Sequence, residues 1–238
     1  MVQEFPGQAR FVEENYGESE LARRFGVTRY PAIFVNDVLA ATPNDFGFYG
    51  KGPAGGGRYA PIREAEGQNR FRSDLEQMIR LLLERRENEA RAMAAKSPQS
   101  GLTSWPNITL HDLDGRPIRA EDLRGRAVVL ELWATWCPPC RGTLRWLGEM
   151  KQRYGDRLAV VAMAIESDST EVRTLTRQMN LPFRWVMGTP ESVRAFGDVS
   201  AVPTLHLFNR SGAFVESYFG APPDLHPRAE AQLTSLTR

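Results

Sequence analysis

The chain has 238 residues, of which 42% are hydrophobic and 25% charged, a composition typical of one large or two modest globular domains. Its 30 Lys and Arg residues balance 29 acidic residues, and the net charge of +1 argues against a nucleic-acid-binding protein, which needs a basic surplus. No apolar run approaches the roughly 20 residues of a membrane helix, and the first residues lack the basic start and apolar stretch of a signal peptide. Two cysteines, Cys137 and Cys140, are too few for a disulfide-stapled scaffold or a cysteine-only zinc site.

The first part of the chain ends in a predicted helix and a linker. Apolar residues recur at steps of three and four over residues 71–82, which predicts an amphipathic helix. Ser, Pro and Gly follow without periodicity at 96–101, as is typical of a linker. We therefore expect a first domain over residues 1–96, a linker over 97–104 and a second domain over 105–238.

The second part alternates strand and helix signals. A continuous apolar run at Ala127–Trp133 predicts a strand buried on both faces, and a helix follows from Pro139 to about Tyr154. The other predicted elements, in chain order, are a hairpin at 105–118, a strand at 158–165, a helix at 168–179, a strand at 183–187, a helix at 191–196, a hairpin of 204–208 with 213–219, and a helix from about 228. Strands that alternate with helices indicate an α/β sheet covered on both faces.

Cys137 and Cys140 form a Cys-Pro-Pro-Cys motif where a predicted buried strand ends and a helix begins. Unpaired N–H groups and the helix dipole favour an anion at a helix N-terminus, so we expect the Cys137 thiol to be reactive near neutral pH. Pro139 suits the first helical turn, because its missing N–H would have no partner there. Cys140 lies one turn further in and can attack a mixed disulfide formed by Cys137, which is thiol–disulfide exchange.

Two other interpretations of this motif are weaker. A disulfide between residues this close closes too small a loop to stabilise a fold by much. Zinc requires four ligands, and His111, His206 and His226 show no ligand spacing, so we predict no metal site and no cofactor. The motif is best interpreted as a redox-active dithiol.

The segment Trp133–Arg141, Trp-Ala-Thr-Trp-Cys-Pro-Pro-Cys-Arg, resembles the active site of thioredoxin-fold oxidoreductases, most of all their TlpA/ResA branch. The resemblance extends over about residues 102–238 and includes the hairpins at 110–117 and 209–220 and an inserted strand and helix before Pro203. It implies an α/β thioredoxin fold, in which helices flank a central mixed sheet. It also implies protein disulfide or dithiol clients, an upstream dithiol electron donor and an extracytoplasmic location, although this chain shows no export signal.

The resemblance also assigns residues that bind the client. Val202-Pro203-Thr204 matches the family's cis-proline loop, which packs against the dithiol and offers backbone groups to an extended client. The alternative is an ordinary turn proline. Trp136 and Pro138, which flank the reactive thiol, complete the expected client-binding surface.

Glu131 lies on the predicted buried strand that leads to the dithiol. In thioredoxins the matching position carries a buried acid that exchanges protons with the second cysteine, and burial raises the pKa of a carboxyl so that it can act as a base near neutral pH. The alternative is an acid at a strand edge that water satisfies. Thr143 and Arg145 stand where the TlpA/ResA branch usually has Glu and Pro, so the branch's usual tuning of the cysteines and its cytochrome-maturation role are not implied. This leaves Glu131 as the candidate to compensate.

Residues 1–96 contain no cysteine, yet residues 21–35 echo residues 192–207. Both segments read as a short helix ending in Phe-Gly, a loop into proline and a strand. We therefore predict that the first part is an incomplete or degenerate thioredoxin-like lobe, with Tyr30-Pro31 as its own cis-proline. Either the recorded start lies inside a longer gene product, or the lobe serves for docking or for homodimer formation.

These observations predict a thiol:disulfide oxidoreductase that exchanges its Cys137–Cys140 dithiol with protein disulfides, and we expect it to act as a reductase. One alternative is a redox-responsive docking module without turnover, with the cis-proline groove as its binding site. A thiol peroxidase is a weaker alternative, because peroxiredoxins place Pro and Thr where this chain has Leu130 and Ala134. The reduction potential and the client do not follow from the sequence, because they depend on the relative stability of dithiol and disulfide.

Overall fold

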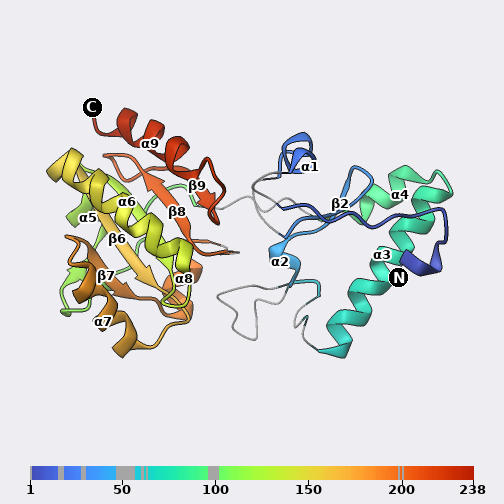
Figure 1. The fold of residues 1–238 in the computed structure, drawn as a ribbon, viewed down its shortest axis with the longest axis horizontal. Coiled ribbons are helices and arrows are strands. Elements are labelled where there is room, and N and C mark those ends of the chain that lie inside the picture. Colours follow the sequence, from blue (N-terminus) through green and yellow to red (C-terminus); the bar gives the residue numbers. More distant parts are fainter. Residues whose placement is uncertain are drawn as a thin grey trace. The chain divides into compact units, whose positions relative to one another are not determined.

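The computed structural model describes residues 2–15, 19–27, 31–46, 57–59, 62, 64–95, 102–197, 199 and 201–238. The chain divides into two compact units, Met1–Gln99 and Ser100–Arg238. Figure 1 shows the fold of both units and labels many of their helices and strands.

The second unit is built on a five-stranded mixed sheet with the strand order β7-β6-β5-β8-β9. Strands β5, β6 and β7 are parallel, whereas β8 runs antiparallel to β5 and β9 runs antiparallel to β8. The five strands are β5 (Ala127–Trp133), β6 (Leu158–Ala164), β7 (Arg184–Met187), β8 (Thr204–Phe208) and β9 (Phe214–Phe219). Every residue of β5 and β6 is buried, because both strands have a neighbour at each edge and side-chain layers on both faces. The predicted α/β class with a central mixed sheet is confirmed.

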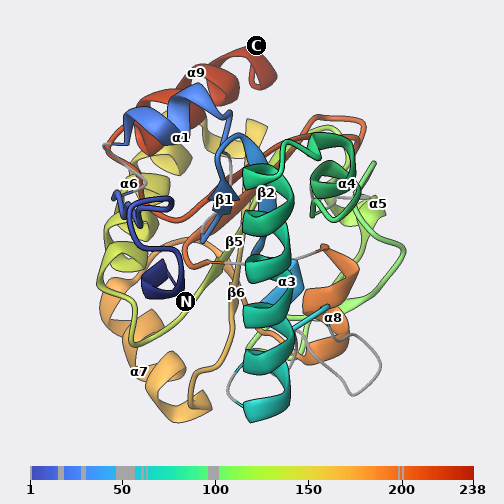
Figure 2. The same ribbon diagram turned by 90° about the vertical axis from the view of Figure 1, so that its right-hand side faces the viewer.

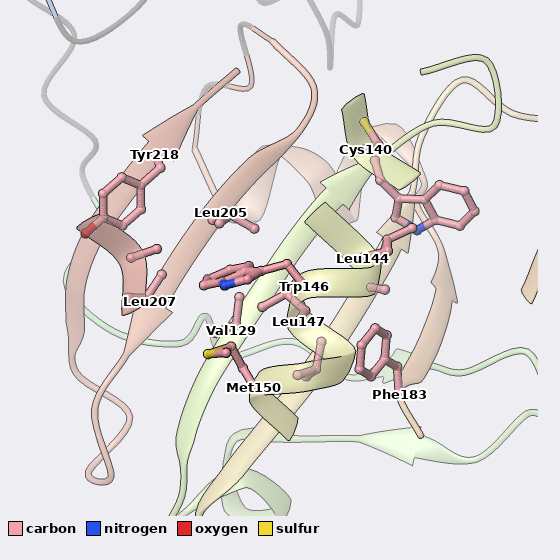
Figure 3. Close-up of a cluster of buried hydrophobic side chains, with 14 of the residues drawn as sticks. Val129, Cys140, Leu144, Trp146, Leu147, Met150, Phe183, Leu205, Leu207 and Tyr218 are labelled. Atoms are coloured by element: carbon pink, nitrogen blue, oxygen red, sulfur yellow. The ribbon is translucent and has the colours of Figure 1, made fainter. Parts of the chain in front are cut away.

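Three helices cover one face of this sheet: α6 (Pro138–Tyr154), α7 (Ser169–Met179) and α9 (Leu225–Leu236). Helices α6 and α7 each connect two parallel strands, and right-handed crossovers in the same direction along the sheet place both on the same face (Figures 1 and 2). Buried side chains of α6 pack on β5 and β8, and Figure 3 shows Leu144 and Leu147 of α6 near Val129 of β5. This layer fixes the direction in which the N-terminus of α6 points.

The opposite face of the sheet is covered by α8 (Pro190–Ala195) and by an aromatic cluster. Phe196, which ends α8, and Trp105 pack edge-to-face on each other and on Phe208 of β8, with ring centroids 4.9 to 6.5 Å apart. The remaining elements of this unit are β3 (Leu110–His111), β4 (Pro117–Ile118), α5 (Ala120–Leu123) and the 3-10 turn η2 (Gly155–Arg157). Strands β3 and β4 form the predicted hairpin, although its paired part is shorter than expected.

The start of α9 differs from the sequence expectation. The helix begins at Leu225 rather than at about Arg228. Pro227 therefore lies within its first turn, where the missing N–H has no helical partner to lose. The earlier start brings His226 into the helix, which matters for the site.

The first unit contains a two-stranded hairpin and a long helix. Strand β1 (Ile33–Val35) pairs antiparallel with β2 (Val38–Ala41), and α3 (Ala65–Leu83) packs its buried side chains against β2. Helix α3 starts before the predicted residue 71, because its first turns are polar and give no apolar period. The other elements are η1 (Val2–Glu4), α1 (Glu20–Arg24), α2 (Pro43–Phe46) and α4 (Glu87–Ala92).

The two units share a local backbone pattern. Helix α1 ends at Phe25 and a left-handed Gly26 (φ 62°), and α8 ends at Phe196 and a left-handed Gly197 (φ 88°). An antiparallel strand pair and then a helix follow in each unit. That the first unit is a partial thioredoxin-like lobe stays a prediction, and Tyr30, half of its predicted cis bond, lies outside the described residues.

The described part of the predicted linker is short. Residues 97–101 lie outside the described residues, and Ser104 forms a β-bridge with Ala213 of the second unit.

Asp168 caps α7, and its removal should destabilise the second unit. Its carboxylate accepts hydrogen bonds from the backbone N–H groups of Thr170 (2.8 Å) and Glu171 (3.1 Å). Asp168→Ala leaves both donors without this acceptor and is expected to lower the free energy of unfolding by about 1 kcal/mol in urea denaturation. Asp168→Asn keeps an acceptor oxygen and is the matched control, expected within a few tenths of a kcal/mol of the wild type. Equal losses in both variants would contradict the capping role.

Candidate active site

The two cysteines lie at the N-terminus of α6, directly after β5. Cys137 is the extended N-cap residue (φ −101°, ψ 100°), and Pro138 and Pro139 occupy the first helical turn. The cysteines form a disulfide with Cα atoms 5.4 Å apart. The Cys137 sulfur accepts a hydrogen bond from the backbone N–H of Cys140 at 3.2 Å. When the disulfide is open, the same N–H can stabilise a thiolate at Cys137.

Exposure distinguishes the residues of this motif. Cys140 is completely buried and Cys137 is 4% exposed, whereas the neighbouring Trp136 is 54% exposed. Figure 3 shows Cys140 at one end of α6, with Leu144 and Leu147 further along the helix. An incoming disulfide therefore meets Trp136 and the edge of Cys137 first, and Cys140 lies behind them.

The loop between β5 and α6 is held at Thr135 through three of its polar groups. Its N–H donates to Ser167 Oγ, its hydroxyl donates to Glu171, and its carbonyl accepts from Arg141, each at 2.9 Å. Sequence reasoning missed Ser167 and Glu171, because they are ordinary polar residues whose role appears only when β6 and α7 are placed beside the motif. These bonds fix the backbone that leads into Cys137.

Trp136 is held by one further bond to the same region. Its indole N–H donates to the carbonyl oxygen of Glu166 at 2.9 Å. Glu166 has a left-handed backbone (φ 46°), a conformation that is uncommon for a residue other than glycine. The indole is thus oriented although more than half of its surface is exposed.

The peptide bond between Val202 and Pro203 is cis, as predicted. Val202 packs against the hydrophobic cluster that contains Cys137 and Cys140, so the loop and the dithiol share one core. The Pro203 carbonyl accepts from the Gly220 N–H (2.8 Å), which ties the loop to the residue after β9. Thr204 is buried, and its hydroxyl donates to the Ala201 carbonyl at 2.6 Å, so this side chain braces the loop from within.

Glu131 lies in the middle of β5, opposite Ala162 of β6 and Leu205 of β8. The side chain is completely buried, which excludes the strand-edge alternative, and neither carboxyl oxygen has a hydrogen-bond partner in the described part of the chain. Burial raises the pKa of this carboxyl well above its usual value. Val129 and Trp133, two positions away on either side, pack in the same cluster as α6, so Glu131 points toward the face of the sheet that α6 covers.

Known proteins resemble the second unit in sequence. A profile described as the AhpC/TSA family matches residues 103–215. The thiol-disulfide oxidoreductase ResA of Bacillus cereus is 31% identical over 117 residues, which is 48% of this chain and 67% of ResA. The thioredoxin-like protein YneN of Bacillus subtilis is 29% identical over 118 residues, which is 48% of this chain and 69% of YneN.

The chain belongs to the ResA-like redoxin family. It is a thiol-disulfide oxidoreductase, and its second unit has the thioredoxin fold. Among solved structures, a putative thiol:disulfide interchange protein DsbE from Chlorobium tepidum matches 60% of this chain and 100% of its own, with 26% identity and a TM-score of 0.53. A second thioredoxin-family protein from that organism matches 61% of this chain with 23% identity and a TM-score of 0.52, which supports the fold alone.

Compared with the pattern expected for the ResA-like family, this chain departs at Thr143 and Arg145. Thr143 is buried on α6, whereas Arg145 is exposed. The Thr143 hydroxyl lies 3.3 Å from His226 Nε2 of α9. Sequence reasoning did not place His226 at the site, because the residue is distant in sequence and has no motif around it.

Within the described residues, no group of three or more His, Cys, Asp or Glu side chains could hold a metal ion. Among the described helices, none is long and apolar enough to cross a membrane.

Proposed function

We propose that the protein reduces disulfides of client proteins through its Cys137–Cys140 dithiol. The observation that carries the proposal is the cysteine pair itself, with Cys137 at the helix N-terminus and Cys140 buried one turn behind it. The Cys137 thiolate attacks one client sulfur, so the Cys137–client bond forms and the client's own S–S bond breaks. The Cys140 thiolate then attacks Cys137 and releases the second client sulfur as a thiolate. Two electrons pass to the client, and the protein is left as the disulfide.

The surroundings of the dithiol favour the reducing direction. A dithiol is a strong oxidant when its reduced form is stabilised, and that stabilisation requires positive charge or several donors at the thiolate. In the described residues the hydrogen bond to the Cys137 sulfur comes from one backbone N–H. A single donor gives the thiolate little stabilisation, which favours the disulfide over the thiolate, as a reductase requires.

We assign the client-binding surface to residues at the exposed side of the dithiol. The indole of Trp136 offers an oriented apolar contact, and Pro138 follows the reactive cysteine. The cis bond before Pro203 presents the backbone of Val202 to an extended client strand. Thr204 supports this loop from within through its bond to Ala201.

Glu131 is proposed to manage the proton of Cys140. A carboxyl whose pKa burial has raised can accept a proton near neutral pH and return it, which an ordinary glutamate does poorly. The proton of the Cys140 thiol must leave before Cys140 attacks Cys137. Glu131 is therefore assigned as the acid and base of the resolving step.

The cycle requires a partner besides the client. Each turnover leaves a Cys137–Cys140 disulfide, so an upstream dithiol donor has to reduce it. The first unit, which contains no cysteine, is proposed to dock a partner or to form a homodimer. Sedimentation of the full chain and of a chain truncated to the second unit would test the homodimer: loss of a dimer on truncation supports it, and identical monomers contradict it.

Reduction of insulin tests the proposed function. With dithiothreitol as the donor, catalytic amounts of the protein are expected to accelerate insulin precipitation at least about tenfold over dithiothreitol alone. Cys137→Ser is the control and should give the background rate. A folded protein that binds insulin but leaves the rate at background would favour the docking module instead, and consumption of hydrogen peroxide without insulin reduction would favour the peroxidase.

A further inference from the structure

A chain of polar contacts leads from the dithiol turn to the surface of α9. Thr143 is buried on α6, one helical turn after Cys140, and side chains at this spacing are neighbours on the same helix face. Its hydroxyl donates to the Pro139 carbonyl at 3.4 Å and lies 3.3 Å from His226 Nε2. Helical side chains point back toward the N-terminus, and the contact with Pro139 shows that the Thr143 hydroxyl does so here. The hydroxyl thus lies between the turn of the dithiol and the imidazole.

The His226 ring is fixed in this position. It stacks on the indole of Trp146 with ring centroids 4.7 Å apart and only 5° between the planes. Trp146 belongs to α6 and lies one turn after Thr143, so one helix supplies both the polar contact and the stacking partner. His226 itself is only partly buried. The Nε2 atom of the ring therefore lies beside the buried Thr143 hydroxyl, while the residue as a whole still has access to water.

We propose that His226 is a positioning residue that removes the proton of the Cys140 thiol through the Thr143 hydroxyl. When client and Cys137 are joined, Cys140 is a free thiol. The Thr143 hydroxyl turns from the Pro139 carbonyl toward His226, its Oγ1 accepts the Cys140 proton, and its own proton passes to His226 Nε2. The resulting Cys140 thiolate attacks Cys137, the client thiolate leaves, and the imidazolium gives its proton to water. This inference deepens the proposed function and rests on it.

The relay requires a neutral imidazole with an unprotonated Nε2. Burial lowers the pKa of His226, and the carboxylate of Glu149 on α6 opposes this effect. The charged residues two positions before and after His226 along the chain are paired with each other. On α9, Arg228 pairs with Asp224, and it also pairs with Glu216 of β9. The ring is therefore neutral at pH 7 and becomes protonated, and inactive in the relay, as the pH falls through its pKa.

The relay also complements Glu131. That carboxyl is completely buried without a hydrogen-bond partner in the described residues, so it has no visible route by which to exchange its proton with water. His226, which is only partly buried, supplies such a route on the same face of the sheet. With two proton acceptors available, we expect the resolving step to lose only part of its rate when either Glu131 or His226 is replaced.

The resolving step can be isolated by reacting the reduced protein with an aromatic disulfide whose thiol product is coloured. Cys137 attack releases the first coloured thiol, and Cys140 attack on the mixed disulfide releases the second. At pH 7 we expect His226→Gln and Thr143→Val to slow the second release roughly tenfold, with the first release unchanged. At pH 9, where hydroxide deprotonates the Cys140 thiol directly, the deficit should vanish. Thr143→Ser, which keeps the hydroxyl, should restore the wild-type profile.

Two outcomes would overturn the relay. If the pH–rate profiles of both variants coincide with that of the wild type, the proton leaves by another route. A deficit of equal size at every pH would show a structural role only. The probe requires no client protein, so failure of insulin reduction would remove the proposed client chemistry without changing this result.

Discussion

Cys140→Ser should trap clients on Cys137 as stable mixed disulfides. The first step needs only the Cys137 thiolate, whereas release needs the thiolate of Cys140, which the variant lacks. Incubation of reduced Cys140→Ser protein with oxidised insulin is expected to give a covalent adduct that reducing agent dissolves. Non-reducing electrophoresis and mass spectrometry measure it directly.

Cys137→Ser is the matched control for this experiment. Its remaining cysteine is completely buried, so adduct formation should fall at least about a hundredfold. Comparable adduct yields from both variants would contradict the assignment of Cys137 as the attacking residue. An adduct with Cys137→Ser alone would reverse the two roles.

Glu131→Gln should slow exchange and stabilise the fold at the same time. The exchange rate at pH 7 is expected to fall roughly tenfold or more, because the amide cannot accept the proton of Cys140. For stability, the carboxyl has a higher pKa in the folded than in the unfolded state. Its favourable contribution is complete below the unfolded pKa and is lost as the pH rises through the folded pKa. The variant should therefore match the wild type near pH 4 and gain about 1–3 kcal/mol above the folded pKa.

Urea denaturation of the oxidised proteins across pH measures this difference. Glu191→Gln, which removes an exposed carboxyl on α8, is the control and should show no such pH dependence. If Glu131→Gln and wild-type stabilities run parallel across the range, the carboxyl does not titrate as its burial requires. An unchanged pH–rate profile would remove Glu131 from the mechanism.

The sequence sufficed for the parts of the fold that local patterns encode. The apolar run of β5, the dithiol before α6 and the start of α7 near residue 168 are all set by neighbouring residues, and the structure has them where the patterns indicate. The cis bond at Pro203 was also predictable, through the resemblance. Contacts between segments distant in the sequence were not predictable. Thr135 with Glu171 and Thr143 with His226 are ordinary polar residues whose meaning depends on tertiary packing.

A single turnover without dithiothreitol shows whether electrons pass from the reduced protein to an equimolar oxidised client. After acid quenching, the free thiols on each of the two proteins are counted. We expect the client to gain two thiols while Cys137 and Cys140 become a disulfide. Retention of both thiols on Cys137 and Cys140, with the client disulfide intact, would contradict it.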